Sequence, residues 1–256
     1  MSTFDVYAAY YDLFYEDKLY EDEAAFVARL IHEYAPRADT ILELGCGTGR
    51  HALALARQGF SLTGVDLSPQ MIDRAKAPLR DARLPAGSRV SFGVGDARTA
   101  RFDQTFDAVA SLFHVMSYQV TNDDLAGTIR TATSHLTAGG VFLFDCWYGP
   151  AVLTSRPEVR VKRGENSELR VFRVAEPLMH PDRNVVDVQH TVWIEQKSTG
   201  AITRLSEVHS MRYLFYPELE MMLASAGMVI RQACEWMSGK PLDATTWSAT
   251  FVAVKQ

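Results

Sequence analysis

The sequence is poor in cysteine, in long apolar runs and in excess positive charge, and each shortage excludes a class of protein. Only three cysteines occur in 256 residues, Cys46, Cys146 and Cys234, and all lie in apolar strand patterns. Buried thiols are therefore expected rather than disulfides or metal ligands. No apolar segment approaches the ~20 residues that span a bilayer, and no signal peptide pattern opens the chain, so we expect a soluble cytoplasmic protein. The net charge of −5, with no basic stripe, argues against a nucleic acid partner.

A glycine-rich turn between a strand pattern and a helix pattern is the most informative feature present. Residues 40–49 read Thr-Ile-Leu-Glu-Leu-Gly-Cys-Gly-Thr-Gly, with Glu43 two positions before Gly45, and with Gly47 and Gly49 following. Glycine tolerates positive φ and close approach by a ligand, and a helix start presents free N–H groups. The run predicts a nucleotide-cofactor loop. An NAD-type fingerprint would place the third glycine one position later, which disfavours an oxidoreductase.

The next two motifs also fit a nucleotide site. The strand pattern 61–66 ends in Asp66, 17 positions after Gly49, where a carboxylate can accept two hydrogen bonds from ribose hydroxyls. After it, Ser68 is a predicted N-cap, and Met71 can cover one face of a planar base. NAD enzymes share the acid, so this feature alone does not discriminate.

Three further strand patterns complete the first half of the chain. Residues 90–97 end in Gly-Asp-Ala, 106–114 end at His114, and 136–145 follow a helix with a predicted glycine C-cap. The carboxyl ends of strands in an open α/β sheet face the ligand crevice. Topology therefore places 114–118 near the reacting centre.

The order of strand-like and helix-like hydrophobic patterns along the chain predicts a doubly wound, mostly parallel α/β sheet with an inserted antiparallel sheet. Helices are predicted within 5–35, and strands alternate with helices from 40 to about 147. The insertion and the return to the core are predicted as four strands, one helix and two strands, at 158–162, 169–178, 185–195, 202–215, 217–226, 228–235 and 248–255. We divide the chain into a cofactor-binding core (1–150), a β insertion (151–215) that is expected to cover the acceptor or to form a dimer surface, and a C-terminal return (216–256).

These motifs resemble those of the class I S-adenosylmethionine (SAM) methyltransferases, whose sheet has seven strands in a Rossmann-like arrangement. The acid before the first glycine and the wording Asp-Leu-Ser-Pro-Gln-Met at 66–71 carry the resemblance. With the tyrosine-rich segment 7–15 and the β insertion, the chain is similar to bacterial nucleotide-sugar N-methyltransferases. Those enzymes methylate the amino group of dTDP-linked deoxyaminosugars, so this resemblance implies SAM as cofactor and such a sugar as acceptor.

The resemblance and the topology together predict the site residues. The residues expected to bind SAM are Tyr7, Tyr11, Tyr20, Glu43, Gly45, Cys46, Gly47, Gly49, Asp66, Leu67, Met71, Asp96, Ala97 and Leu112. His114 is expected to take a proton from the acceptor and Tyr118, which stands where the family has a histidine, to orient it. The residues expected to contact the acceptor are Tyr15, Asp145, Trp147 and Tyr148.

Several alternatives stay open at the level of sequence. The acceptor atom can be a hydroxyl oxygen, or the chain can bind SAM without catalysis, with the β insertion serving as a partner surface or joining two chains. A base-amino methyltransferase of nucleic acid is disfavoured because no Asn/Asp-Pro-Pro-Tyr-like motif follows the fourth strand. His51, in the first turn after the glycine loop, can approach the SAM carboxylate, but exposure to solvent is the expected outcome. The other histidines, among them His190 and His209, show no metal-like spacing, so no metal is expected.

Overall fold

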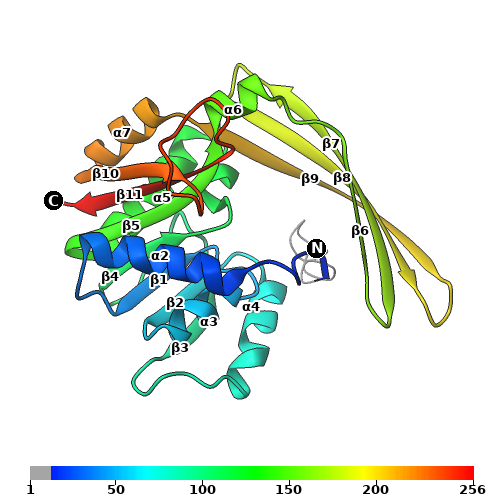
Figure 1. The fold of residues 1–256 in the computed structure, drawn as a ribbon, viewed down its shortest axis with the longest axis horizontal. Coiled ribbons are helices and arrows are strands. Elements are labelled where there is room, and N and C mark those ends of the chain that lie inside the picture. Colours follow the sequence, from blue (N-terminus) through cyan, green and yellow to red (C-terminus); the bar gives the residue numbers. More distant parts are fainter. Residues whose placement is uncertain (1–12) are drawn as a thin grey trace.

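The core is a mixed sheet covered by helices on both faces, seen in a computed structural model that describes residues 13–256 (Figure 1). Its strands follow the order β3-β2-β1-β4-β5-β11-β10. Their bounds are β1 Thr40–Leu44, β2 Ser61–Asp66, β3 Val90–Val94, β4 Phe106–Ser111, β5 Leu136–Tyr148, β10 Met228–Glu235 and β11 Ser248–Lys255. The first five pair in parallel, and β11 lies antiparallel between β5 and β10. The predicted seven-stranded doubly wound sheet is confirmed.

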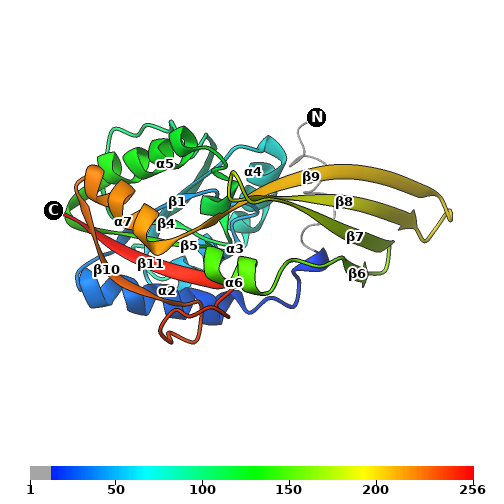
Figure 2. The same cartoon turned by 90° about the horizontal axis from the view of Figure 1, so that it is seen from above.

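Helices pack the two faces of this sheet, as Figure 2 shows from above. On one face lie α2 (Tyr20–Tyr34), α3 (Arg50–Arg57) and α4 (Pro69–Lys76), which bury apolar side chains against β1 and β2. On the other lie α5 (Asn122–His135) and α7 (Tyr216–Ser225). The short elements are η1 (Ala77–Arg80), η2 (Val115–Tyr118) and α6 (Gly149–Thr154). No helix in this described part is both long and apolar enough to cross a membrane.

Helix α4 begins where the sequence predicts it, because Ser68 caps its first turn. The Ser68 side chain accepts a hydrogen bond from Met71 N at 3.3 Å, and proline fills the first position of α4. The predicted glycine C-cap before β5 is wrong, because α5 ends at His135 and passes directly into the strand. Gly139, with φ +72°, instead forms the irregularity where β5 shifts register against β4.

The β insertion is an antiparallel sheet that projects away from the core (Figure 1). Its strands are β6 Arg160–Glu165, β7 Leu169–His180, β8 Val185–Gln196 and β9 Ile202–Leu214. All four predicted strands are present with bounds shifted by at most a few residues. The end of β9 pairs with the end of β5 through Trp147↔Tyr213 and Tyr148↔Leu214, and this parallel pairing joins the insertion to the core sheet.

Candidate functional site

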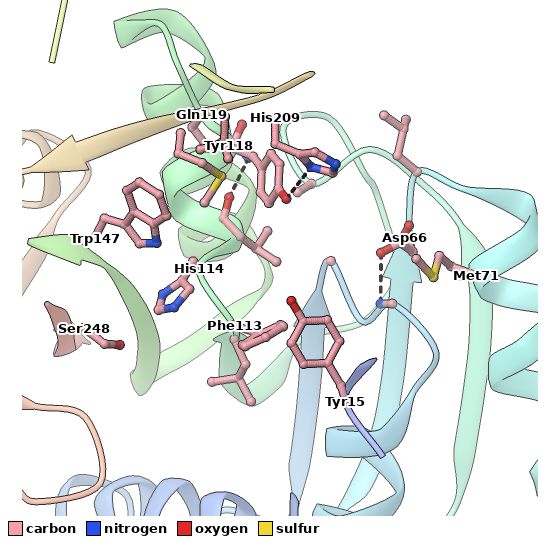
Figure 3. Close-up of a pocket in the computed structure, with 18 of the residues that line it drawn as sticks. Tyr15, Asp66, Met71, Phe113, His114, Tyr118, Gln119, Trp147, His209 and Ser248 are labelled. Atoms are coloured by element: carbon pink, nitrogen blue, oxygen red, sulfur yellow. Dashed lines mark hydrogen bonds between the residues drawn. The ribbon is translucent and has the colours of Figure 1, made fainter. Parts of the chain in front are cut away.

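One cavity of about 760 Å³ lies between the carboxyl ends of the core strands and the insertion (Figure 3). The loop after β1 and the ends of β2, β3 and β4 form one side of it. The opposite side comes from β7, β8 and β9, through side chains that include Arg173, His190, His209 and Met211. Each of these four belongs to the same face of the inserted sheet, because alternate residues of a strand share a face. A ligand in the cavity would contact both parts of the chain.

The glycine loop forms the cavity wall as predicted, except at its last residue. Gly45, Cys46 and Gly47 line the cavity, whereas Gly49 does not. Gly45 has φ +77°, and a Cβ placed on it would lie 2.6 Å from the Val115 side chain. Gly49 precedes α3 with φ +72°, and its Cβ would meet the ring of Phe92 at 2.6 Å. Gly49 therefore serves the packing of α3 on β3 rather than direct contact with a ligand.

Two carboxyl groups lie at the loop. Asp66 lines the cavity and accepts hydrogen bonds from Gly47 N and Ser68 N, each at 2.9 Å. Burial raises its pKa, although these two bonds oppose the shift. Glu43 is fully buried behind the loop, and burial, followed by the charge of Asp66, raises its pKa to about 8. Glu43 Oε2 has no hydrogen-bond partner within residues 13–256, so this end of the cavity favours a positively charged ligand.

The remaining predicted cofactor residues divide by position. Leu67, Met71, Asp96, Ala97 and Leu112 all line the cavity. Tyr20 does not, because its ring packs against His51 with centroids 4.9 Å apart in a separate surface depression near α3. Tyr7 and Tyr11 lie outside the described residues. The carboxylate of Asp96 is held by Arg98, whose Nε lies 2.9 Å from Oδ1 and lowers the pKa of Asp96.

His114 lies at a strained turn and is held by Asp145. Phe113 and His114 have φ values of +64° and +65°, a region that side chains other than glycine seldom adopt. Asp145 Oδ1 accepts a hydrogen bond from His114 N at 3.0 Å, and Oδ2 lies 2.7 Å from His114 Nδ1. Burial opposes ionisation of Asp145, but the charge of His114 and these contacts hold its pKa below its usual value. The imidazole lines the cavity while the carboxylate lies behind it.

Tyr118 also lines the cavity, and its hydroxyl lies 2.9 Å from His209 Nδ1 (Figure 3). Behind this pair, His209 Nε2 lies 3.7 Å from Glu207 Oε2. His190 completes the cluster, with its ring centroid 4.7 Å from that of His209. One ring nitrogen of His190, one ring nitrogen of His209 and one carboxylate oxygen of Glu207 all lie within 4.8 Å of one another, which is a spacing that could hold a metal ion.

The residues predicted to contact the acceptor are only partly brought together. Tyr15 and Trp147 line the cavity, with the ring of Tyr15 edge-on to Phe113 at 5.1 Å. Tyr148 packs against the hydrophobic core, and Asp145 lies behind two residues that line the cavity, His114 and Ser248. The rings of Trp147 and Trp247 meet edge-on with centroids 5.8 Å apart, and both line the cavity.

The expectation that His51 is exposed to solvent is wrong. His51 is buried, lines the cavity, and its Nε2 lies 2.6 Å from Glu23 Oε2 on α2. Lys18 Nζ contacts the same carboxylate oxygen. Burial lowers the pKa of His51, while Glu23 opposes that shift. No local pattern pairs residues 23 and 51, because the contact depends on how α2 crosses α3.

The insertion contributes the functional side chains that sequence reasoning missed. His190 pairs across the strands with Glu207, and His209 with Val188, so the two histidines and the acid share one face. A spacing rule along the chain cannot find them, because the separation depends on the β8–β9 register. One signal in the sequence places His190 on the apolar face of its strand, which is the alternation of Val186, Val188, His190, Val192 and Ile194.

Comparisons with known proteins identify the part of the chain that forms the glycine-loop side of the cavity as a methyltransferase domain. A family model described as a methyltransferase domain matches residues 41–140. Among curated proteins, the chain is similar to a dTDP-3-amino-3,4,6-trideoxy-alpha-D-glucopyranose N,N-dimethyltransferase of Streptomyces venezuelae. The two are 28% identical over 92% of this chain and 93% of the relative.

Solved structures are similar over the insertion as well as the core. An S-adenosylmethionine-dependent methyltransferase from Clostridium acetobutylicum has a TM-score of 0.81 at 21% identity, covering 99% of both chains. An amino pentose methyltransferase from Micromonospora echinaspora, solved with SAM bound, has a TM-score of 0.75 at 27% identity. That likeness covers 98% of this chain and 97% of the other.

Proposed function

Since the chain belongs to the class I SAM-dependent methyltransferases, we propose that its acceptor is the amino group of a nucleotide-linked aminosugar. The observation that carries the proposal is the end-to-end similarity to an aminosugar N,N-dimethyltransferase, at 92% of this chain and 93% of the relative. That similarity extends into the insertion, which supplies one side of the cavity wall here. This coverage supports an acceptor side built from corresponding elements in the two proteins.

The glycine-loop end of the cavity fits SAM, which is the cofactor. Gly45, Cys46 and Gly47 allow close approach to the backbone, and Asp66 offers carboxylate oxygens to ribose hydroxyls. The unpartnered buried oxygen of Glu43 matches a positively charged sulfonium or ammonium better than a phosphate. Leu67, Met71, Asp96, Ala97 and Leu112 would surround the base. Bound here, SAM supplies an electrophilic methyl group.

The residues of the chain have to orient the acceptor, exclude water and accept one proton from the acceptor. An amine attacks only with a free lone pair, so an ammonium must first lose a proton. His114 and Tyr118 both line the cavity beside the glycine loop, and both serve this task in our proposal. Asp145 fixes the ring of His114 from behind. Tyr15 and Trp147 provide aromatic surface for the sugar or the nucleotide base.

The insertion (151–215) is proposed as the cover of the acceptor rather than a separate binding module. Its inner face lines the cavity through Arg173, His190 and His209. Arg173 has two guanidinium nitrogens, Nε and Nη1, that are buried without hydrogen-bond partners in the described part of the chain. A buried guanidinium of this kind suits an anionic group of the acceptor. The regions 1–150 and 216–256 then form the cofactor-binding core.

The test is methyl transfer from SAM to a panel of small acceptors, followed by mass spectrometry. We expect dTDP-linked 3-aminosugars to gain mono- and dimethyl products, whereas the matched 3-hydroxysugars gain none. Methylation of the hydroxysugars alone would make the chain an O-methyltransferase. SAM binding without transfer to any member of the panel would overturn the proposed acceptor and leave the cofactor assignment intact.

A second copy of this chain is the partner we propose for the far face of the insertion. Val161, Leu178, Ile202 and Val208 lie on that face and are all between 47 and 66% exposed. These side chains are spread along the length of that face, so a second copy packed against the whole face would cover all of them. Analytical ultracentrifugation should detect a homodimer that a double substitution, Leu178→Lys with Ile202→Lys, converts to monomer. A wild-type monomer at assay concentration would refute the dimer.

A further inference from the structure

We infer that Tyr118, His209 and Glu207 form a proton relay, in which His209 receives the acceptor proton through the Tyr118 hydroxyl. The inference rests on the proposed function, because the acceptor must be an amine or hydroxyl that loses a proton. The Tyr118 hydroxyl is within hydrogen-bond distance of His209, and Glu207 is within ion-pair distance of the same ring. Tyr118 lines the cavity, His209 lies behind its hydroxyl, and Glu207 lies behind His209.

The relay requires Tyr118 to be the donor in its hydrogen bond with His209. Burial, as the largest influence, raises the pKa of Tyr118 far above its usual range, so the phenol keeps its proton. A protonated hydroxyl can donate, and we assign it as the donor to His209 Nδ1 across 2.9 Å. In the neutral ring the proton then belongs to Nε2, which faces Glu207 Oε2 at 3.7 Å. The unprotonated Nδ1 then faces the Tyr118 hydroxyl, from which it can accept a proton.

The carboxylate of Glu207 stabilises the protonated form of His209. Both of its carboxylate oxygens are buried, and neither has a hydrogen-bond partner within residues 13–256. An unpaired buried carboxylate is unfavourable, and an imidazolium 3.7 Å away offsets that cost. The cross-strand pairing of Glu207 with His190 keeps the acid on the cavity face of the sheet.

The other charged and titratable groups around His209 make it the proton-holding histidine of the pair. His190 on β8 has its pKa lowered to about 3 by burial and then by the charges of Arg173 and His209, so it stays neutral. Arg173 on β7 also acts on Tyr118, as do Tyr15 and Asp66. Of these two histidines, His209 is the one with the Tyr118 hydroxyl on its cavity side and a carboxylate behind it.

The proton transfer balances without any further reactant. The acceptor N–H bond breaks, its electron pair stays on nitrogen, and the proton passes to the Tyr118 oxygen. In the same step the proton of Tyr118 passes to His209 Nδ1, so no tyrosinate forms. His209 becomes an imidazolium beside Glu207 and returns its proton to water between turnovers. Dimethylation requires the cycle twice, once before each new N–C bond.

The relay is tested with His209→Asn and Glu207→Gln, because asparagine can still accept the Tyr118 hydrogen bond but cannot hold the proton. We expect kcat near pH 7 to fall about 100-fold in His209→Asn, the usual scale of general base catalysis, and less in Glu207→Gln. The deficit of each variant should shrink as pH rises and solvent deprotonates the acceptor, while the SAM Kd is unchanged. His180→Asn is the matched control, since His180 pairs with Asp187 at 2.8 Å on the same sheet but outside the cavity.

A second readout needs no turnover. In protein labelled with nitrogen-15 in its histidines, NMR should show His209 with a bare Nδ1 and a protonated Nε2 in the neutral form. A proton on Nδ1, or a pH-independent deficit in His209→Asn, would overturn the relay. Tight binding of one Zn²⁺ that is lost in His190→Ala would also overturn it, because the cluster would then be a metal site. If the wild type methylates no aminosugar, the proposed function fails, and the NMR result still decides the state of His209.

Discussion

Asp66→Asn is the substitution that tests the cofactor end of the cavity most directly. Asp66 accepts two backbone hydrogen bonds at 2.9 Å, from Gly47 N and Ser68 N, and we assign its remaining acceptor capacity to the SAM ribose. Asparagine keeps one oxygen and replaces the other with a donor. One backbone N–H then faces another donor, and the ribose loses a charge-assisted partner.

The expected losses follow from these contacts. Hydrogen bonds to a charged group contribute about 1.5–3 kcal/mol each, so loss of one at the ribose should weaken SAM binding at least ~10-fold. The mismatched backbone N–H should lower the free energy of unfolding by about 2 kcal/mol. Calorimetric titration with SAM measures the first effect, and urea unfolding without SAM measures the second.

Asp107→Asn is the matched control. Asp107 also accepts backbone hydrogen bonds, from Asp39 N and Thr40 N at 3.1 Å, but at the amino end of β1, away from the cavity. Both N–H groups donate to Oδ2, which the asparagine oxygen can replace, so this variant should lose only the charge of the acceptor and keep its SAM affinity. Wild-type SAM affinity in Asp66→Asn would refute the ribose assignment. Equal loss of SAM affinity in both variants would show that Asp66 acts through stability alone.

Three further predictions concern Glu43, the glycine loop and Asp145. Because the pKa of Glu43 is raised to about 8, the free protein should lose stability as pH rises from 4.5 toward 8. SAM binding at pH 7 should release a proton, detected by calorimetry in two buffers and abolished by Glu43→Gln. Gly47→Ala, with φ +55° and open space, should cost about 1–2 kcal/mol in urea unfolding, and Gly45→Ala more, because its Cβ meets Val115 at 2.6 Å. The lowered pKa of Asp145 gives stability that is present above the usual value of 3.8 and is lost as pH falls through the folded value, so Asp145→Asn should flatten the acid limb of unfolding free energy against pH.

The cofactor half of the cavity was predictable because its chemistry is local in sequence. Gly45, Gly47 and Asp66 line the cavity where the motifs indicated, and Ser68 caps α4 as expected. A glycine turn needs only a few consecutive residues, and a strand end is fixed by its own pattern. Gly49 is the exception, since its role in packing on Phe92 depends on β3, which lies about forty residues further along.

The errors share one physical cause, which is contact between distant elements. His51 is buried because α2 delivers Glu23 and Lys18 to it, and no local pattern reports that crossing. Tyr20 faces the same group rather than the main cavity. The end of α5 was misplaced because an irregularity in β5 uses the glycines that resemble a C-cap.

The acceptor half was the least predictable because strand register decides its composition. A shift of β9 by one residue would turn Glu207 and His209 to the far face and bring Val208 into the cavity in their place. The same sequence composition would then give an apolar wall with no acid or base. If the insertion covers the acceptor as we propose, specificity depends on the β8–β9 register and on the β5–β9 pairing that ties the insertion to the core. Substitutions at these pairings should change which acceptor is methylated while leaving SAM binding intact, because the glycine loop and Asp66 belong to other elements.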